Sequence, residues 1–220
     1  MKLTDWRLEQ DHEVVYRISS PQGDRQPIAL LLHGRTGDES SMGVFASTLP
    51  NRYLTVCPRG LLSDPEGGYT WLPQFPNSYW PNLRDFHQPV ATLTVLLDSI
   101  RERHLARVDQ MIVIGFSQGA ALACAFALSA PAQVGALVLL SGFVPEITNG
   151  RRAEHGLRDM PVFVAHGIQD RLIPIALAEK GVNSLEELGG RVELCTTPVG
   201  HKVGGGCLRA LREWLAHLSL

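Results

Sequence analysis

The residues best suited to chemistry form the segment Gly115–Gly119, which reads Gly-Phe-Ser-Gln-Gly. An apolar run from Met111 to Ile114 precedes it and an Ala-rich stretch follows it. A Gly-x-Ser-x-Gly turn between a strand and a helix is a nucleophile elbow, which holds the serine hydroxyl above the edge of a sheet. Glycine is needed at both ends because side chains there would collide across the turn. The pattern therefore predicts that Ser117 is a nucleophile and that the backbone N–H of Gln118 faces a developing oxyanion.

A serine hydroxyl needs a base to take its proton, and the base needs an acid that orients it. In open α/β sheets the active groups lie beyond the carboxyl ends of the strands. Asp170 follows the predicted strand Val162–Ala165 at that end, whereas Asp159 precedes the same strand. Asp170 is therefore the predicted acid, and the alternative is a turn or helix-capping aspartate.

The predicted base is His201, which follows the strand Val192–Cys195 in a loop that opens the last helix. The alternative for this residue is an exposed loop histidine. His166 also ends a strand, but it lies only four residues before Asp170, and a role in stabilising that loop is favoured for it. The chain order serine, acid, histidine differs from the orders found in the chymotrypsin and subtilisin classes of serine hydrolase.

Strand and helix patterns alternate along the chain. Several of the apolar runs of strand length are continuous rather than alternating; the runs are found at Val14–Ile18, Ile28–Leu32, Tyr53–Cys57, Met111–Ile114, Ala136–Leu140, Val162–Ala165 and Val192–Cys195. Helical patterns separate them at Glu39–Thr48, Pro89–His104, Gln118–Ser129, Ile175–Leu188 and Val203–His217. Uninterrupted apolar strands are typical of a sheet that is buried on both faces. The sequence predicts an α/β fold with a mostly parallel central sheet and helices on both faces.

Two long connections interrupt this pattern. The segment 60–87 is rich in proline and aromatic residues that could line a pocket, and of these Trp71 is the one we select. The segment 141–160 has room for a short helix and is too short for a separate cap domain. We therefore expect one domain over residues 1–220, without a large cap.

These motifs resemble the α/β-hydrolase superfamily and, within it, the phospholipase/carboxylesterase family, which includes acyl-protein thioesterases and small bacterial carboxylesterases. The resemblance runs from about Ile28 to Leu215, and its carriers are Leu32-His33-Gly34, the segment Gly115–Gly119, His166-Gly167-x-x-Asp170 and Gly200-His201.

The resemblance implies a Ser117 nucleophile, a His201 base, an Asp170 orienting acid, and an oxyanion hole formed by the backbone N–H groups of Arg35 and Gln118. It also places Trp71 near the acyl pocket. The Arg35 side chain is expected to be solvated rather than to clamp substrate. The chain departs from the family pattern at Lys202, where many relatives carry an acidic or small residue, and this departure leaves the substrate open.

The composition of the chain further limits the classes of function that we expect. A net charge of −2 gives no basic footprint for nucleic acid, and no apolar stretch is long enough to span a membrane. The N-terminus has no signal-like apolar core, so we expect a cytoplasmic location. The four cysteines show no C-x-x-C spacing, which favours reduced, buried thiols over a disulfide or a zinc site. Neither a metal nor another cofactor is expected.

The sequence thus predicts a serine hydrolase that cleaves carboxylic esters or thioesters of small or acyl-chain substrates, and homo-oligomers are possible. The alternative from another class is a noncatalytic module that uses the same fold to bind a small ligand. A peptidase and a dienelactone-type hydrolase are alternatives among enzymes, although the latter would favour cysteine at position 117.

Overall fold

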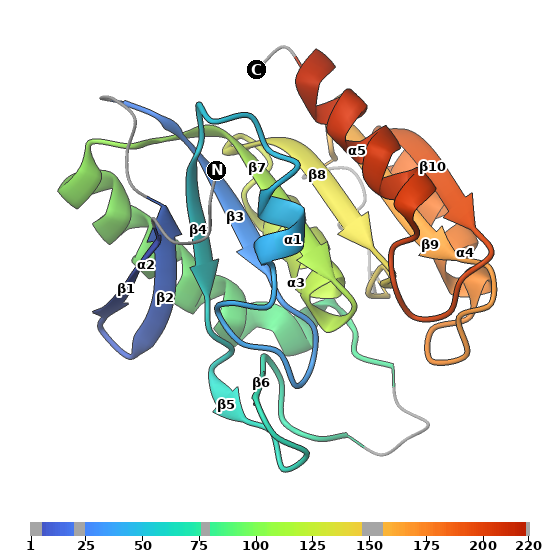
Figure 1. Ribbon diagram of the computed structural model, residues 1–220, viewed down its shortest axis with the longest axis horizontal. Helices are drawn as coiled ribbons and strands as arrows, with labels where there is room; N and C mark the ends of the chain where they lie inside the picture. The colour runs from blue at the N-terminus through green and yellow to red at the C-terminus, as the bar shows by residue number, and fades with distance from the viewer. Residues whose placement is uncertain (1–5, 20–24, 76–79, 147–155, 219–220) are drawn as a thin grey trace.

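The protein is described by a computed structural model that covers residues 6–19, 25–75, 80–146 and 156–218. Its centre is an eight-stranded sheet in the order β1-β2-β4-β3-β7-β8-β9-β10 (Figure 1). The strands are β1 (Trp6–Asp11), β2 (Val14–Ser19), β3 (Pro27–Leu32), β4 (Leu54–Pro58), β7 (Arg107–Phe116), β8 (Val134–Leu140), β9 (Pro161–Gly167) and β10 (Arg191–Thr197). Only the β1–β2 and β2–β4 pairs are antiparallel. The predicted mostly parallel sheet is confirmed.

Helices cover both faces of this sheet (Figure 1). They are α1 (Gly43–Ala46), α2 (His87–His104), α3 (Gln118–Ser129), α4 (Ile175–Glu187) and α5 (Gly205–His217), together with the short 3-10 helix η2 (Leu83–Phe86). Successive residues of β3 serve opposite cores: Leu30 packs with α2 and α3, and Leu31 packs with α1 and α5. Both leucines are fully buried, which explains why the strand sequence is apolar without alternation.

The two largest differences from the sequence prediction have physical causes. Strand β1 was not predicted because it is an edge strand in which only Trp6 is buried, so its sequence carries no apolar period. The helix expected at Glu39–Thr48 is reduced to the single turn α1. Before that turn the Asp38 carboxylate accepts hydrogen bonds from the Ser40 N–H and the Ser41 hydroxyl, which stabilises a turn instead of a helix. The short helix considered within 141–160 concerns in part residues 147–155, which lie outside the described residues.

A two-stranded ribbon, β5 (Leu62–Ser63) and β6 (Tyr69–Thr70), lies beside the loop that follows β3. The Tyr69 N–H donates to the Gly37 carbonyl (2.8 Å). A Cβ on Gly68 would lie 2.1 Å from the Thr36 carbonyl oxygen, so only glycine permits this approach. Much of the segment 60–75 therefore packs against the loop at 34–37.

The expectation of four reduced thiols is wrong for two of the cysteines. Cys195 in β10 and Cys207 in α5 form a disulfide, with their Cα atoms 5.7 Å apart. The sequence spacing could not reveal this pair, because it forms only when α5 folds back onto β10. Cys57 and Cys124 are free and buried as expected, and burial raises the pKa of the Cys124 thiol to about 12. Cysteine usage no longer supports a cytoplasmic location, since disulfides persist mainly in oxidising compartments.

The disulfide closes a short loop, and its loss is expected to lower the free energy of unfolding by about 3 kcal/mol through loop-closure entropy. The measurement is urea denaturation of the wild type and of a Cys195→Ala, Cys207→Ala double variant. Adding reductant should lower the stability of the wild type and leave that of the double variant unchanged. Thiol counting in denaturant should find two free thiols among the four cysteines; finding four would contradict the disulfide.

Among the described helices, none has both the length and the apolar character that crossing a bilayer requires.

Candidate active site

The predicted nucleophile lies on a strained turn between β7 and α3. Ser117 has φ +54°, a conformation that is unfavourable for a residue with a side chain. A Cβ on Gly115 would lie 2.1 Å from the Gly119 carbonyl oxygen, and a Cβ on Gly119 would lie 2.2 Å from the Leu32 carbonyl oxygen. Both glycines are therefore required by contact, as the sequence pattern predicts, and the turn presents Ser117 at the carboxyl edge of the sheet.

Three side chains from separate elements meet at this edge. His201, in the loop between β10 and α5, places its Nε2 atom 3.0 Å from the Ser117 hydroxyl oxygen. Its Nδ1 atom lies 2.7 Å from a carboxylate oxygen of Asp170, which follows β9. The carboxylate accepts a hydrogen bond from Nδ1–H. In this neutral tautomer Nε2 carries no proton, so it accepts a hydrogen bond from the Ser117 hydroxyl. The structure thus brings together the three residues selected from the sequence.

The Asp170 carboxylate is held in its ionised form. Burial acts to raise its pKa, but hydrogen bonds from the Ile173 N–H, from His201 and from the Leu172 N–H outweigh burial and lower the pKa below its ordinary value. His166 has the loop-stabilising place expected for it. Its Nε2 donates to the Ile173 carbonyl oxygen (2.8 Å) and lies 3.6 Å from the Asp170 carboxylate.

The two predicted oxyanion donors lie on either side of the nucleophile. Gln118 is the first residue of α3, where the backbone N–H has no partner within the helix. Gly34 touches the elbow, since a Cβ on it would lie 3.1 Å from the Ser117 Cβ, and Arg35 is next in the chain. Within the described residues neither the Arg35 N–H nor the Gln118 N–H forms a hydrogen bond, so both can donate to an oxyanion.

A buried network holds this donor loop. The Gly60 N–H donates to His33 Nε2 (2.8 Å), so the opposite ring nitrogen carries the proton and donates to the Gly34 carbonyl (2.7 Å). Burial is the main cause of the lowered pKa of His33, which favours this neutral form. The Gln118 side chain accepts from the Thr70 hydroxyl (3.0 Å) and the Trp71 N–H (2.9 Å). The sequence motifs did not indicate the role of the Gln118 amide.

Trp71, selected from the sequence as a pocket residue, is buried. Its side chain is only 1% exposed, and its indole N–H donates to the His33 carbonyl (2.8 Å). The tryptophan belongs to the core that supports the donor loop, because a buried indole N–H requires an acceptor there. Among the described aromatic residues of the segment 60–87, Trp80 lines a cavity.

The Arg35 side chain turns away from the elbow. Its guanidinium donates to the Asp64 carboxylate (2.6 and 3.2 Å) and to Glu66 (2.7 Å). These hydrogen bonds raise the pKa of Arg35 above its ordinary value. The side chain is thus neither simply solvated nor a substrate clamp; it ties the donor loop to the segment that leads from β5 to β6.

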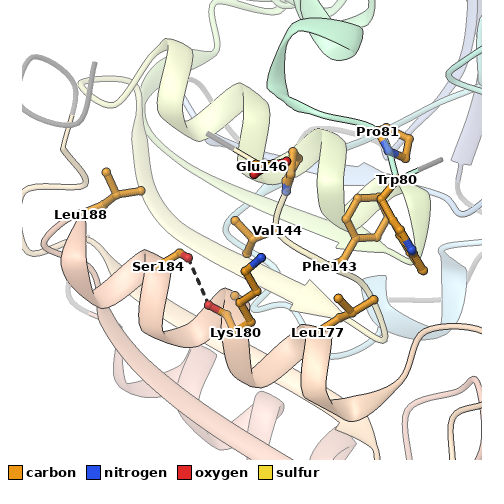
Figure 2. Close-up of a pocket in the computed structure, with 11 residues that line it drawn as sticks. Trp80, Pro81, Phe143, Val144, Glu146, Leu177, Lys180, Ser184 and Leu188 are labelled. Carbon is orange, nitrogen blue, oxygen red and sulfur yellow. Dashed lines mark hydrogen bonds between the residues drawn. The ribbon is translucent and has the colours of Figure 1, made fainter. Parts of the chain in front are cut away.

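Two cavities flank the elbow. The first, of about 340 Å³, lies between α4 and the loop after β8 (Figure 2). Trp80 and Phe143 meet edge to face at one end of it, with ring centroids 5.0 Å apart, and the Lys180 amine points toward Val144. Gly142 links this cavity to the nucleophile, since a Cβ on it would lie 2.9 Å from the Ser117 carbonyl oxygen. The second cavity lies on the side of Arg35 and Lys202.

A cluster of three or more histidine, cysteine or acidic side chains that could hold a metal ion is not found in the described parts of the chain.

The mostly parallel sheet, the elbow after β7 and the helices on both faces define an α/β-hydrolase fold. The chain belongs to the phospholipase/carboxylesterase family, whose model matches residues 14–219. The fold class and the family predicted from the sequence are both confirmed, and so is the hydrolase class at the level of the family.

Individual relatives agree with this assignment. The chain is 30% identical over 174 residues to acyl-protein thioesterase 1 of Kluyveromyces lactis, a match that covers 72% of this chain and 76% of that protein. It is 41% identical to acyl-protein thioesterase 1 of Saccharomyces cerevisiae over 75 residues, 33% of this chain and 32% of the relative. A carboxylesterase from Mesorhizobium loti superposes with a TM-score of 0.83 at 21% identity, covering 97% of this chain and all of that one.

Proposed function

We propose that the chain hydrolyses carboxylic esters or thioesters through an acyl-enzyme formed on Ser117. The observation that carries the proposal is the continuous hydrogen-bonded chain from Ser117 through His201 to the ionised Asp170. Relatives named thioesterase and carboxylesterase support both substrate classes. A noncatalytic binding module is not favoured, because such a module has no need for all three groups in this arrangement.

The proposed reaction has two steps. The Ser117 oxygen attacks the substrate carbonyl while His201 Nε2 takes its proton, and the carbonyl oxygen becomes negatively charged beside the N–H groups of Arg35 and Gln118. The imidazolium then donates its proton to the leaving alcohol or thiol, which departs and leaves the acyl group on Ser117. Water attacks the acyl-enzyme with the same base, and the acid is released. Asp170 holds the ring and stabilises its charged form.

The proton transfer also orients the substrate. Because His201 protonates the leaving group, that group must lie on the histidine side of the reacting carbonyl. We assign the acyl chain to the cavity along α4, whose lining includes Phe143, the residue after Gly142. Its lining combines Glu146, Lys180 and Ser184 with apolar side chains such as Val144 and Leu177. Against the apolar part, each buried methylene of the acyl chain would add about 0.8 kcal/mol.

The test is rapid mixing of the protein with an activated short-chain ester. We expect a burst of alcohol equal to the concentration of active sites, followed by slower turnover, as for an acyl-enzyme. Mass spectrometry of the quenched protein should find the acyl mass on the peptide that carries Ser117. Turnover with the acyl group on another residue, or no reaction with any ester or thioester, would overturn the proposal.

A further inference from the structure

The second cavity, here called the Lys202 cavity, includes in its lining Arg35, one of the two candidate oxyanion donors. It has a volume of about 380 Å³ and is lined by Gly34, Arg35, Thr36, Gly37, Ser41, Met42, Val44, Phe45, Phe116, Lys202, Val203 and Leu208. This volume lies within the range of pockets that hold small molecules. All of the lining residues belong to the described part of the chain, and the proposed function assigns none of their side chains a role in catalysis.

The position of this cavity relates it to the leaving group. The Phe116 ring, which forms part of its wall, lies 5.2 Å from the His201 ring between centroids, and Lys202 is the next residue after His201. The wall continues into Gly34, which touches the nucleophile. The cavity therefore opens on the histidine side of the reaction centre, where the group protonated by His201 must lie.

The charge of the lining is positive. Arg35 and Lys202 are its charged residues, and no aspartate or glutamate belongs to its described lining. Arg35 is already paired with Asp64 and Glu66, whereas Lys202 is exposed and forms no ion pair with any described residue. The Asp38 carboxylate is near this wall, but its oxygen accepts from the Ser40 N–H and the Ser41 hydroxyl. Lys202 thus contributes an ammonium group without a described ion-pair partner to a lining that also contains apolar side chains such as Phe45 and Phe116.

We propose that the Lys202 cavity binds the leaving group of the substrate and that Lys202 selects leaving groups that carry an anionic substituent, a carboxylate or a phosphate. This inference rests on the proposed function, because it needs His201 as the acid that protonates the leaving group. An ammonium binds such an anion by a charge-assisted hydrogen bond, and the apolar wall of Phe45, Phe116 and Leu208 accommodates the rest of the alcohol or thiol. Lys202 is a specificity-determining residue in this scheme, and the acyl chain occupies the other cavity.

The experiment compares two butanoate esters, nitrophenyl butanoate and the same ester with one carboxylate on the nitrophenol ring. The quantity measured is the ratio of kcat/KM for the anionic ester to kcat/KM for the neutral ester. Any disturbance of His201 by a change at its neighbour affects both esters and cancels in the ratio. Wild type, Lys202→Gln, Lys202→Glu and Lys202→Arg are compared. Lys180→Gln is the matched control, because Lys180 lines the other cavity (Figure 2).

We expect the ratio to fall about tenfold in Lys202→Gln, further in Lys202→Glu, and to be retained within about twofold in Lys202→Arg and in Lys180→Gln. High salt should lower the ratio of the wild type. A ratio in Lys202→Gln that matches the wild type, or one that falls equally in Lys180→Gln, overturns the inference while leaving the proposed function intact. Failure of the wild type to hydrolyse either ester or to become acylated contradicts the proposed function and this inference together.

Discussion

Replacing Ser117 with alanine is expected to reduce kcat for ester hydrolysis by on the order of 10⁶-fold. The hydroxyl oxygen is the atom that forms the acyl bond, and no other described side chain bonds to His201 Nε2. In serine hydrolases the loss of the nucleophile costs about as much as the loss of the whole triad, and the residual rate comes from the oxyanion donors and substrate binding. The measurement is kcat with an activated ester, together with the absence of acyl mass on the variant.

The matched control for this variant is Ser141→Ala. Ser141 directly follows the neighbouring strand β8, is fully buried, and also has a positive φ of 45°. Its hydroxyl has no hydrogen-bond partner within the described residues. Both variants place alanine in a left-handed conformation beyond a parallel strand, so their effects on folding should be similar. Loss of activity only in Ser117→Ala, with similar thermal melting of both, is the expected result; equal activity of the two variants would exclude Ser117 as the nucleophile.

The sequence predicts most of the sheet because the apolar pattern of a buried strand is contained in the strand's own residues. The inner parallel strands β3, β4, β8 and β9 are buried on both faces, so their apolar runs are visible without any knowledge of their neighbours. The rule about the carboxyl edge of the sheet then selects Asp170 over Asp159, and the short spacing between His166 and Asp170 favours His201 as the base. The apolar pattern fails for β1, because its place at the sheet margin leaves only Trp6 buried.

What the sequence could not predict depends on contacts between distant segments. Cys195 and Cys207 pair because α5 returns to β10, and nothing in their spacing indicates that return. Trp71 and Trp80 belong to the same aromatic segment, yet one is buried beneath the donor loop and the other lines a cavity. The difference between the two tryptophans depends on the acceptor beside the Trp71 indole, the His33 carbonyl, which comes from a distant segment of the chain. Composition identifies such a segment as a possible pocket wall but not which side chain faces the pocket.

Replacing Asp170 with asparagine is expected to reduce kcat by on the order of 10⁴-fold. The N–H groups of Leu172 and Ile173 both donate to the same carboxylate oxygen of Asp170. An asparagine would keep its carbonyl oxygen at that place, because the two donors require an acceptor. Its NH₂ group would then face His201 Nδ1 and donate to it, so the proton of the neutral ring would move to Nε2. In that tautomer the ring donates to the Ser117 hydroxyl and cannot take its proton.

The variant also changes the dependence of stability on pH, and the sign follows from the lowered pKa of Asp170. A carboxyl group whose pKa is lower in the folded chain stabilises that chain above its unfolded pKa, and this contribution is lost as pH falls through the folded pKa. We therefore expect Asp170→Asn to be less stable than the wild type at neutral pH and the difference to shrink in acid. Thermal melting across pH measures this, and activity is compared at a temperature where both proteins are folded.

The matched control is Asp159→Asn. Asp159 lies at the opposite end of β9 and is exposed, and its positive φ of 61° is one that asparagine tolerates. The control should keep the activity of the wild type, whereas Asp170→Asn should keep its fold, lose turnover and still acylate Ser117 slowly. Equal rates for Asp170→Asn and Asp159→Asn would show that Asp170 does not orient the base. A loss of activity confined to Asp159→Asn would place the acid at the other end of the strand and contradict the geometry of His201.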